Sequence, residues 1–447
     1  MVFETKQKRR NLNDHAPLVR VDALDRISQF PEHIIHLFLF FMPPKDAART
    51  SALSKTWRRA WNSVHRSDFT FSYYCNRIVL EKRGAEFSKF VKSVDEALLP
   101  LREHKTIIQC FRLSMTVCDD KYAPCIDNWM ELANRNHMET LYLDLTRMGR
   151  VKSYVLPKTT FSVGSLAKLT LKGCILLVDY FGDNMNKFIC LRKLTLESVE
   201  VDDLTVKKIL CCCPLLEEFT LSWCMKAEFV HIGYALKLKT AILRLLGCGA
   251  KPMLQVNCEN LHSFKCYWHA IPSSFTITPC CLLKIENTLY LHNHLDTFSF
   301  LTLRQYLGNF KEYQTLKLLL FSSTISFTLE ELSKDLPISP VANVQQLELG
   351  HVPIMQDYTD LLDGILWSCH PKFLFLFLDC VTNWLTFMRC VLWFLGETLL
   401  NGDEEAKCCG DSQMKCWRHY LRAVKSESYF HPGLMKYVNF RHCDAFF

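Results

Sequence analysis

Two features of exported and membrane-inserted proteins are missing from this chain of 447 residues. Residues 1–20 are polar and basic and lack the apolar segment of a secretory signal. The most hydrophobic stretch, residues 373–400, is interrupted by Asp379, Arg389 and Glu397, so its charge-free runs do not exceed nine residues. A membrane-spanning helix needs roughly 18 to 20 such residues. We therefore expect no membrane partner and a location in the cytoplasm, the nucleus or both.

The motifs of common enzyme classes are missing as well. The sequence has no phosphate-binding glycine loop, no G-x-S-x-G elbow and no H-E-x-x-H helix. Isolated pairs of Cys and His carry little weight in a chain with 22 cysteines and 16 histidines, because many will be neighbours by chance. We expect a protein that is not an enzyme and needs no cofactor.

The sequence contains no clear pattern for binding nucleic acid or a metal ion. The formal charge of +7 is modest for this length, and no basic stretch is interleaved with aromatic residues, so no nucleic-acid partner is predicted. The basic run Lys6–Arg10 is either a nuclear-import patch or a solvated tail. The one metal-like group is Cys408, Cys409, Cys416 and His419, whose spacing does not repeat the paired gaps of a zinc site. We predict no metal.

Glycine and proline are scarce, at 15 and 16 residues, and no low-complexity linker separates parts of the chain. With 49% hydrophobic residues the chain has ample material for a core, so its parts should pack together. In the absence of a secretory signal, the cysteines should be reduced thiols that behave as small apolar side chains. We expect the triplet Cys211–Cys213, just before Pro214, to fill the core.

Residues 25–61 are the most informative stretch that is present. A run of apolar residues at helical spacing extends from Pro31 to Phe41 and is ended by Pro43–Pro44. Ser54 can then cap a third short helix, which carries two tryptophans four residues apart. A unit of roughly 40 residues cannot bury this much apolar surface alone. The stretch is therefore either a docking module or a helical hairpin packed on the rest of the chain.

The stretch reads D-R-I-S-Q-F-P at 25–31, P-P-K-D-A-A at 43–48 and R-T-S-A-L-S-K at 49–55. This order of residues resembles the F-box of plant F-box/leucine-rich-repeat proteins. The resemblance implies a three-helix module that docks a Skp-family adaptor and, through it, a cullin–RING ubiquitin ligase. The apolar anchors expected to dominate that contact are Phe30, Pro31, Ile34, Ile35, Phe38, Leu53 and Trp57.

The stretch also departs from the family pattern. His33 stands where an acidic residue is usual, and Phe30 replaces a leucine. Phe40 and Met42 replace serine and leucine. These changes keep the face apolar but alter its shape, so a degenerate F-box in a scaffold or decoy protein remains an alternative.

A repeat runs through the remainder of the chain. The pattern L-x-x-[LF]-x-L begins at Leu166, Leu191 and Leu216, a strict period of 25 residues. A weaker copy begins upstream, at Met138. Others lie around residues 238–245 and in several later segments. Periods of about 20 to 29 residues are typical of leucine-rich repeats, in which each strand leads into a helix or 3₁₀ turn. A general α/β domain with leucine-rich strands is the alternative.

Helices between the strands complete the repeat. Residues 202–210 are expected to form a capped amphipathic helix that ends before Cys213–Pro214. A poorer copy is found at residues 361–366, followed by Cys369-His370-Pro371. This arrangement of helix, Cys-Pro and strand also resembles the repeat of the plant family.

Stacked repeats predict a curved solenoid with parallel strands on its concave side. The leucines of each L-x-L should point into the core and the residue between them outward, because side chains alternate along a strand. The outward residues, our candidates for target binding, are Tyr142, Thr170, Thr195, Thr220, Lys265, Tyr290, Lys317 and Glu348.

The predicted fold is α/β, a three-helix F-box followed by a curved leucine-rich-repeat solenoid. The predicted parts are a basic disordered tail (1–20), the F-box (21–66), connecting or capping irregular repeats (67–135), the solenoid (136–400) and a C-terminal extension (401–447). We expect the substrate-recognition subunit of a Skp–cullin–F-box type ubiquitin ligase. Besides the scaffold or decoy, a receptor whose repeats hold a small molecule is a further alternative.

Overall fold

The fold is described from a computed structural model. The described residues are 30–42, 44–63, 66–70, 88–96, 98, 109–117, 120–135, 138–147, 152–162, 164–177, 188–224, 226–227, 229–245, 253–272, 274–277, 284–292, 294–309, 312–321, 325–326, 342–351, 358–378, 391, 393–396, 417–428 and 436–439. The chain forms two compact units, Met1–Arg66 and Ser67–Phe447, which are treated separately here. The predicted tail 1–20 and the cysteines Cys408, Cys409 and Cys416 lie outside the described residues.

The first unit is a module of three helices, α1 (Glu32–Phe41), α2 (Pro44–Thr50) and α3 (Lys55–Ser63). Pro44 begins α2, where its missing N–H is not needed. The backbone N–H of Trp57 donates to Ser54 Oγ at 3.2 Å, so the predicted cap of the third helix is confirmed. The core of the module is small and consists of Ile35, Leu39, Ala47, Trp57 and Ala60.

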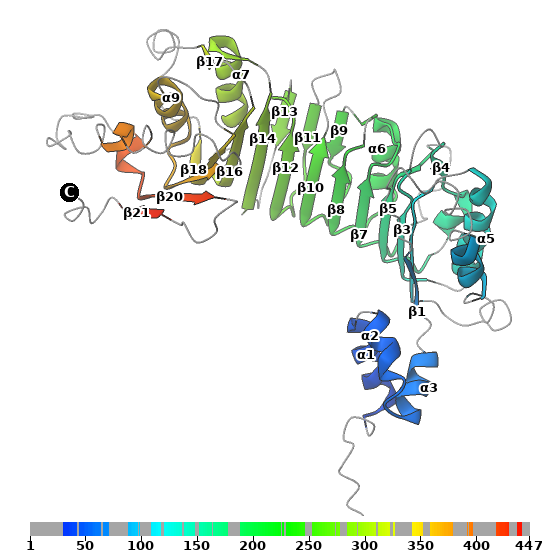
Figure 1. The fold of residues 1–447 in the computed structure, drawn as a ribbon. Helices are drawn as coiled ribbons and strands as arrows, with labels where there is room; N and C mark the ends of the chain where they lie inside the picture. The colour runs from blue at the N-terminus through cyan, green and yellow to red at the C-terminus, as the bar shows by residue number, and fades with distance from the viewer. Residues whose placement is uncertain are drawn as a thin grey trace, which may run out of the picture. The chain divides into compact units, whose positions relative to one another are not determined.

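The second unit is built on one long sheet of 14 strands (Figure 1). Its pairs are parallel from β2 to β20, and β20 and β21 are antiparallel. In order across the sheet, the strands are β1 (Arg66–Thr70), β2 (Cys110–Ser114), β3 (Thr140–Asp144), β5 (Lys168–Lys172), β7 (Lys193–Glu197), β8 (Glu218–Ser222), β10 (Thr240–Leu245), β12 (Ser263–Trp268), β14 (Lys284–Leu291), β16 (Glu312–Leu320), β18 (Asn343–Gly350), β19 (Phe373–Leu378), β20 (Ala423–Ser428) and β21 (Lys436–Asn439).

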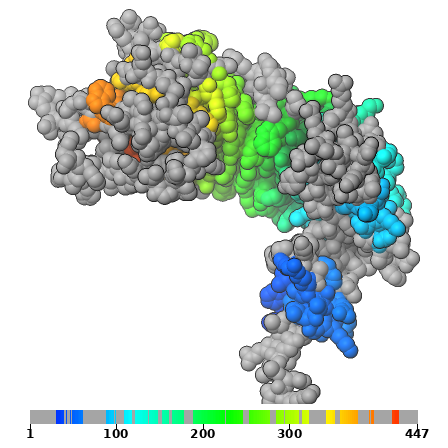
Figure 2. All heavy atoms as spheres, viewed as in Figure 1, coloured from blue at the N-terminus to red at the C-terminus, as the bar shows by residue number. Residues whose placement is uncertain are grey.

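Short elements connect these strands on the other side of the core. The helices and 3₁₀ turns are α5 (Ala123–Arg135), α6 (Asp203–Cys211), α7 (Thr297–Leu307), α9 (Thr359–Cys369), η1 (Asp120–Tyr122), η2 (Lys158–Ser162) and η4 (Trp417–His419). The minor strands are β4 (Tyr154–Val155), β6 (Cys174–Ile175), β9 (Phe229–Ile232), β11 (Met253–Val256), β13 (Ser274–Ile277), β15 (Leu295–Asp296) and β17 (Ile325–Ser326). In the space-filling view the green part of the chain, from β8 to β16, is a continuous block (Figure 2).

The predicted repeat is confirmed by the strand register. Leu169, Leu194 and Phe219 pair with one another across β5, β7 and β8, and each side chain is almost fully buried. The degenerate copy predicted around 238–245 is strand β10, which lies between β8 and β12. One hydrophobic cluster continues through the whole array, because each repeat covers the apolar side of its neighbour.

The sheet extends past both limits predicted for the solenoid, 136 and 400. Strands β1 and β2 precede the first limit, and β20 and β21 follow the second. At the two ends of the sheet, β1 and β21 have a neighbour on one side only, so less of their surface is covered by adjacent repeats. Strand β2, in which Phe111 and Leu113 are buried, lies within residues 67–135, where connecting or capping irregular repeats were predicted.

Helix α6 lies in the connection between β7 and β8 and shows how a connecting helix of the repeat begins. It begins after Asp202, whose carboxylate accepts hydrogen bonds from the backbone N–H of Thr205 at 2.8 Å and from its hydroxyl. These bonds lower the pKa of Asp202 below its usual value. The predicted capped helix over 202–210 is therefore confirmed, as is the helix predicted over 361–366, which is part of α9.

Replacing Asp202 with alanine should destabilise the fold by about 1 kcal/mol at pH 7, the usual value of an N-cap. Because the folded pKa is depressed, the stabilisation is present above the unfolded pKa of about 3.9 and is lost as the pH falls through the folded value. Urea titrations should therefore show a larger difference between wild type and variant at pH 7 than at pH 3, because pH 3 lies below the unfolded pKa. An equal difference at both values would mean that the carboxylate charge plays no part.

The described cysteines are free thiols. Cys212 and Cys213 are buried, so the predicted core-filling role of the triplet is confirmed for these two, while Cys211 is partly exposed. Burial raises the pKa of Cys174 and Cys369 to about 12.

In the described part of the chain no group of three or more His, Cys, Asp and Glu side chains could hold a metal ion. Within the same residues, none of the helices has the length and apolar character of a membrane span.

Candidate functional sites

The first candidate site is a set of four exposed apolar side chains on the helical module, here called the exposed apolar cluster. Phe30, Leu37, Phe38 and Leu53 expose 40%, 52%, 45% and 64% of their surface, unusual values for large apolar side chains on so small a unit. The rings of Phe30 and Phe38 contact each other, with centroids 5.7 Å apart. Such a cluster gains free energy when a partner covers it.

The structure divides the seven predicted adaptor anchors into two groups. Phe30, Pro31, Phe38 and Leu53 are exposed and Ile34 is partly exposed. Ile35 and Trp57 are instead 0% and 3% exposed and belong to the core of the module. Apolar residues cover most of the circumference of helix α1, so periodicity did not reveal which of them face α2 and α3.

This division predicts how Trp57→Ala will behave. Removing a buried tryptophan costs about 3–5 kcal/mol, which a module with five core residues cannot spare. We expect the helices of residues 32–63 to unfold while the sheet unit stays intact. Amide exchange across both units measures this, and unchanged protection of residues 32–63 would contradict the core role of Trp57.

The second candidate site is the face of the long sheet to which the outward side chains point, here called the open face. Register defines two rows of side chains across the strands. The first row is Arg112, Tyr142, Thr170, Thr195, Thr220, Ile242, Lys265, Glu286, Thr315 and Gln346. The second row lies two residues further along each strand and is Ser114, Asp144, Lys172, Glu197, Ser222, Arg244, Tyr267, Thr288, Lys317, Glu348, Phe375 and Lys425.

The eight predicted target-binding residues are all partly exposed on this face, but they do not form one row. Five belong to the first row, from Tyr142 to Lys265. Lys317 and Glu348 belong to the second row, and Tyr290 lies two residues beyond it. They fall in different rows because β14 and β16 have eight and nine residues, so their leucine pairs occur later in the strand.

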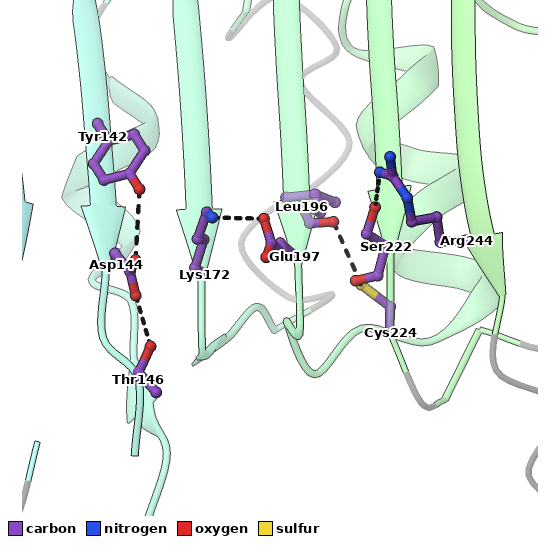
Figure 3. A network of polar contacts seen from close by, with 9 residues as sticks. All are labelled: Tyr142, Asp144, Thr146, Lys172, Leu196, Glu197, Ser222, Cys224 and Arg244. Carbon is purple, nitrogen blue, oxygen red and sulfur yellow. Dashed lines mark hydrogen bonds and ion pairs between the residues drawn. The ribbon is translucent and has the colours of Figure 1, made fainter. Parts of the chain in front are cut away.

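Most charges on the open face are paired between neighbouring strands. Lys172 contacts Glu197 at 2.7 Å and Lys265 contacts Glu286 at 2.6 Å (Figure 3 shows the first pair). Partial burial opposes ionisation of Glu286, but hydrogen bonds from Lys265 and Lys284 outweigh it and lower the pKa of Glu286. Paired charges of this kind favour specificity over raw affinity.

Arg244 has a different environment. Its Nη1 donates to Ser222 Oγ at 3.1 Å, and its guanidinium carbon lies 4.6 Å from the ring centroid of Tyr267 and 5.9 Å from that of Trp223. The sequence analysis missed these residues. The signal was available, because the alternation in Leu243-Arg244-Leu245 and Cys266-Tyr267-Trp268 continues the pattern of the first row.

A stack of rings occupies the end of the strands around Tyr290. His269 lies 4.6 Å from Tyr290, His292 lies 4.8 Å from Phe321, and Phe321 lies 4.1 Å from His351, all centroid distances with nearly parallel planes. Partial burial, together with the nearby imidazole of His292, lowers the pKa of His269. His269 stacks on Tyr290, so part of the ring of this predicted contact residue is already covered.

Comparison with known proteins agrees with this architecture. The F-box domain model matches residues 27–68. A model described as FBD-associated F-box protein At5g56370, LRR repeats, matches residues 126–274. The prediction of an F-box followed by leucine-rich repeats is thereby confirmed.

Relatives in Arabidopsis thaliana carry the same combination in their names. F-box protein At5g03100 is 30% identical over 232 residues, 50% of this chain and 64% of that protein. Putative F-box/LRR-repeat protein At3g18150 is 31% identical over 238 residues, 53% of this chain and 43% of that protein. F-box/LRR-repeat protein At3g03360 is 28% identical over 236 residues, 50% and 44% respectively. The chain therefore spans less than two thirds of the length of each of these relatives.

Proposed function

We propose that this chain, with its F-box and leucine-rich repeats, is the substrate-recognition subunit of a Skp–cullin–F-box type ubiquitin ligase. The observation that carries the proposal is the exposed apolar cluster of the F-box, Phe30, Leu37, Phe38 and Leu53. A small module gains little by leaving four large apolar side chains in water, whereas a Skp-family adaptor that covers them would gain the free energy of their burial.

The open face supports the second half of the proposal. It carries ordered polar, charged and aromatic side chains on rigid strands, in two rows of defined register. Rigid presentation lowers the entropic cost of binding a target protein. The ion pairs along the rows would select among targets by their charge pattern.

Ubiquitin transfer itself would belong to other subunits. The chain would hold a target on its repeats and dock the adaptor through its F-box, which brings a lysine of the target close to a ubiquitin-charged enzyme. Holding two reactants together converts a bimolecular step into an effectively unimolecular one, and this proximity alone accelerates the reaction strongly.

Reconstitution tests the proposal. The full chain is mixed with a recombinant Skp-family adaptor, a cullin and a RING subunit, and co-elution is followed by size-exclusion chromatography. We expect a stoichiometric complex with the adaptor. Failure of the wild-type chain to co-elute would favour the alternative, a scaffold or decoy whose F-box has lost its adaptor, for which the exposed His33 at a usually acidic position provides a reason.

A further inference from the structure

Trp223 has a left-handed backbone conformation, which is unfavourable for a bulky side chain. It follows β8 directly and has φ of +54°, as Gly173 after β5 has +68° and Ser198 after β7 has +51°. The three residues are equivalent, because each backbone N–H donates to a carbonyl of the next strand, those of Glu197, Ser222 and Arg244 respectively. Glycine adopts this left-handed conformation freely, whereas a bulky side chain is strained in it. The conformation of the turn therefore does not explain why a tryptophan is present at this position.

The indole is available to a partner. Trp223 exposes 40% of its surface, and it lies at the edge of the open face beside Arg244. On the neighbouring strand β12, Tyr267 pairs with Arg244, and its ring centroid lies 4.6 Å from the guanidinium carbon. Tryptophan, tyrosine and arginine are the three residue types that dominate binding energy in protein interfaces.

Arg244 also differs from two other cations of its row, Lys172 and Lys317, in how its charge is paired. Lys172 contacts Glu197 and Lys317 contacts Glu348, each on an adjacent strand. Among the residues that the structure describes, Arg244 has no carboxylate within ion-pair distance, and its side-chain hydrogen bond goes to the neutral hydroxyl of Ser222. A guanidinium has five N–H donors, so most of those of Arg244 remain for a ligand.

We propose that Trp223, Arg244 and Tyr267 form the anchoring subsite of the target-binding face and that this subsite takes an aspartate or glutamate side chain of the target protein. The carboxylate accepts two parallel N–H bonds from Arg244, the geometry that a guanidinium offers. The rings of Trp223 and Tyr267 pack against the carbon atoms of the bound residue and shield the pair from water. The inference rests on the proposed function, since it names what the open face recognises in a target.

Selection from a library of displayed random 12-residue peptides tests the subsite. The full chain, immobilised with its F-box free, is the bait, and the recovered peptides are sequenced and synthesised with amidated C-termini for affinity measurement. We expect enrichment of Asp or Glu at one position. Arg244→Glu should weaken the selected peptides at least 100-fold, and Arg244→Lys at least 10-fold, because an ammonium cannot bind a carboxylate bidentately.

Trp223→Gly separates recognition from folding. Glycine relieves the left-handed strain, so this variant should melt at the wild-type temperature or above it while its peptide affinity falls at least 10-fold. Arg192→Gln is the matched control, because Arg192 is an exposed arginine outside the two rows of the open face and is paired with Glu217 at 2.6 Å, so peptide affinity should stay within about twofold.

Several results would overturn the subsite. These are a library that yields no binders, binders without acidic enrichment, unchanged affinity in Arg244→Glu, or binding that requires a free C-terminal carboxylate. Co-elution with the Skp-family adaptor is measured on the same proteins. Loss of the subsite with adaptor binding intact leaves the proposed function standing, whereas a wild-type chain that does not bind the adaptor refutes that function whatever the peptides show.

Discussion

Phe38→Asp should abolish adaptor binding and leave the fold unchanged. The side chain is 45% exposed in the free module and contacts the ring of Phe30, so a carboxylate there stays in water until the adaptor arrives. In the complex the carboxylate would be buried without a partner, at a cost of several kcal/mol. We expect a loss of at least about 100-fold in affinity, roughly 3 kcal/mol, by calorimetric titration.

His33→Asp is the matched control for this experiment. It places the same carboxylate on the same helix at an exposed position near the N-terminus, where negative charge is favourable. It also restores the acidic residue usual in the related F-boxes, so adaptor affinity should be at least that of the wild type. If Phe38→Asp binds as tightly as His33→Asp, the exposed apolar cluster is not the adaptor site.

Leu194→Asp should disrupt the sheet unit over more than one repeat. Leu194 is 1% exposed and pairs in register with Leu169 on β5 and Phe219 on β8. A buried carboxylate in place of this leucine costs at least about 4 kcal/mol, from lost packing and an unpaired charge together. Since each repeat is stabilised through its neighbours, amide exchange should accelerate around Leu169 and Phe219 as well.

Thr195→Asp provides the comparison, because the adjacent residue points to the open face and is partly exposed. Its exchange pattern should match that of the wild type within experimental scatter, with a change in stability of about 0.5 kcal/mol or less. Acceleration confined to the strand of Leu194 would show that the repeats are stabilised independently, contrary to the continuous core.

The regular part of the fold was predictable from local sequence. The period of 25 residues placed β5, β7 and β8 in the observed register, and Asp202 with its amphipathic segment placed α6. In these repeats each strand has five residues and one leucine pair, so pattern and structure coincide.

The irregular part was not predictable in the same way. Strand β14 carries two inward pairs, Ile285 with Asn287 and Leu289 with Leu291, and sequence alone marked only the second. Its pairing with β12 aligns Glu286 with Lys265, which moves Tyr290 away from the first row. Register is set by contact with the neighbouring strand, and that contact is not local in sequence.

The candidate sites also depend on contacts that are not local in sequence. Ile34 and Ile35 are adjacent and equally apolar, yet one is partly exposed and the other fully buried, because only the second faces α2 and α3. Arg244 stands out only after its neighbours on β8 and β12 are known, since the lack of a carboxylate partner is a property of the sheet.

The buried cysteines can report the order in which parts of the array unfold. Only the thiolate reacts with alkylating reagents, and burial raises the pKa of thiols such as Cys174 and Cys369 to about 12, so in the folded array they are protonated at pH 7. Labelling of these residues must therefore wait for the surrounding repeat to open. Because Cys174, Cys224, Cys266 and Cys369 are distributed along the sheet unit, the order in which they acquire a mass tag would record the sequence in which its segments come apart, without any engineered probe.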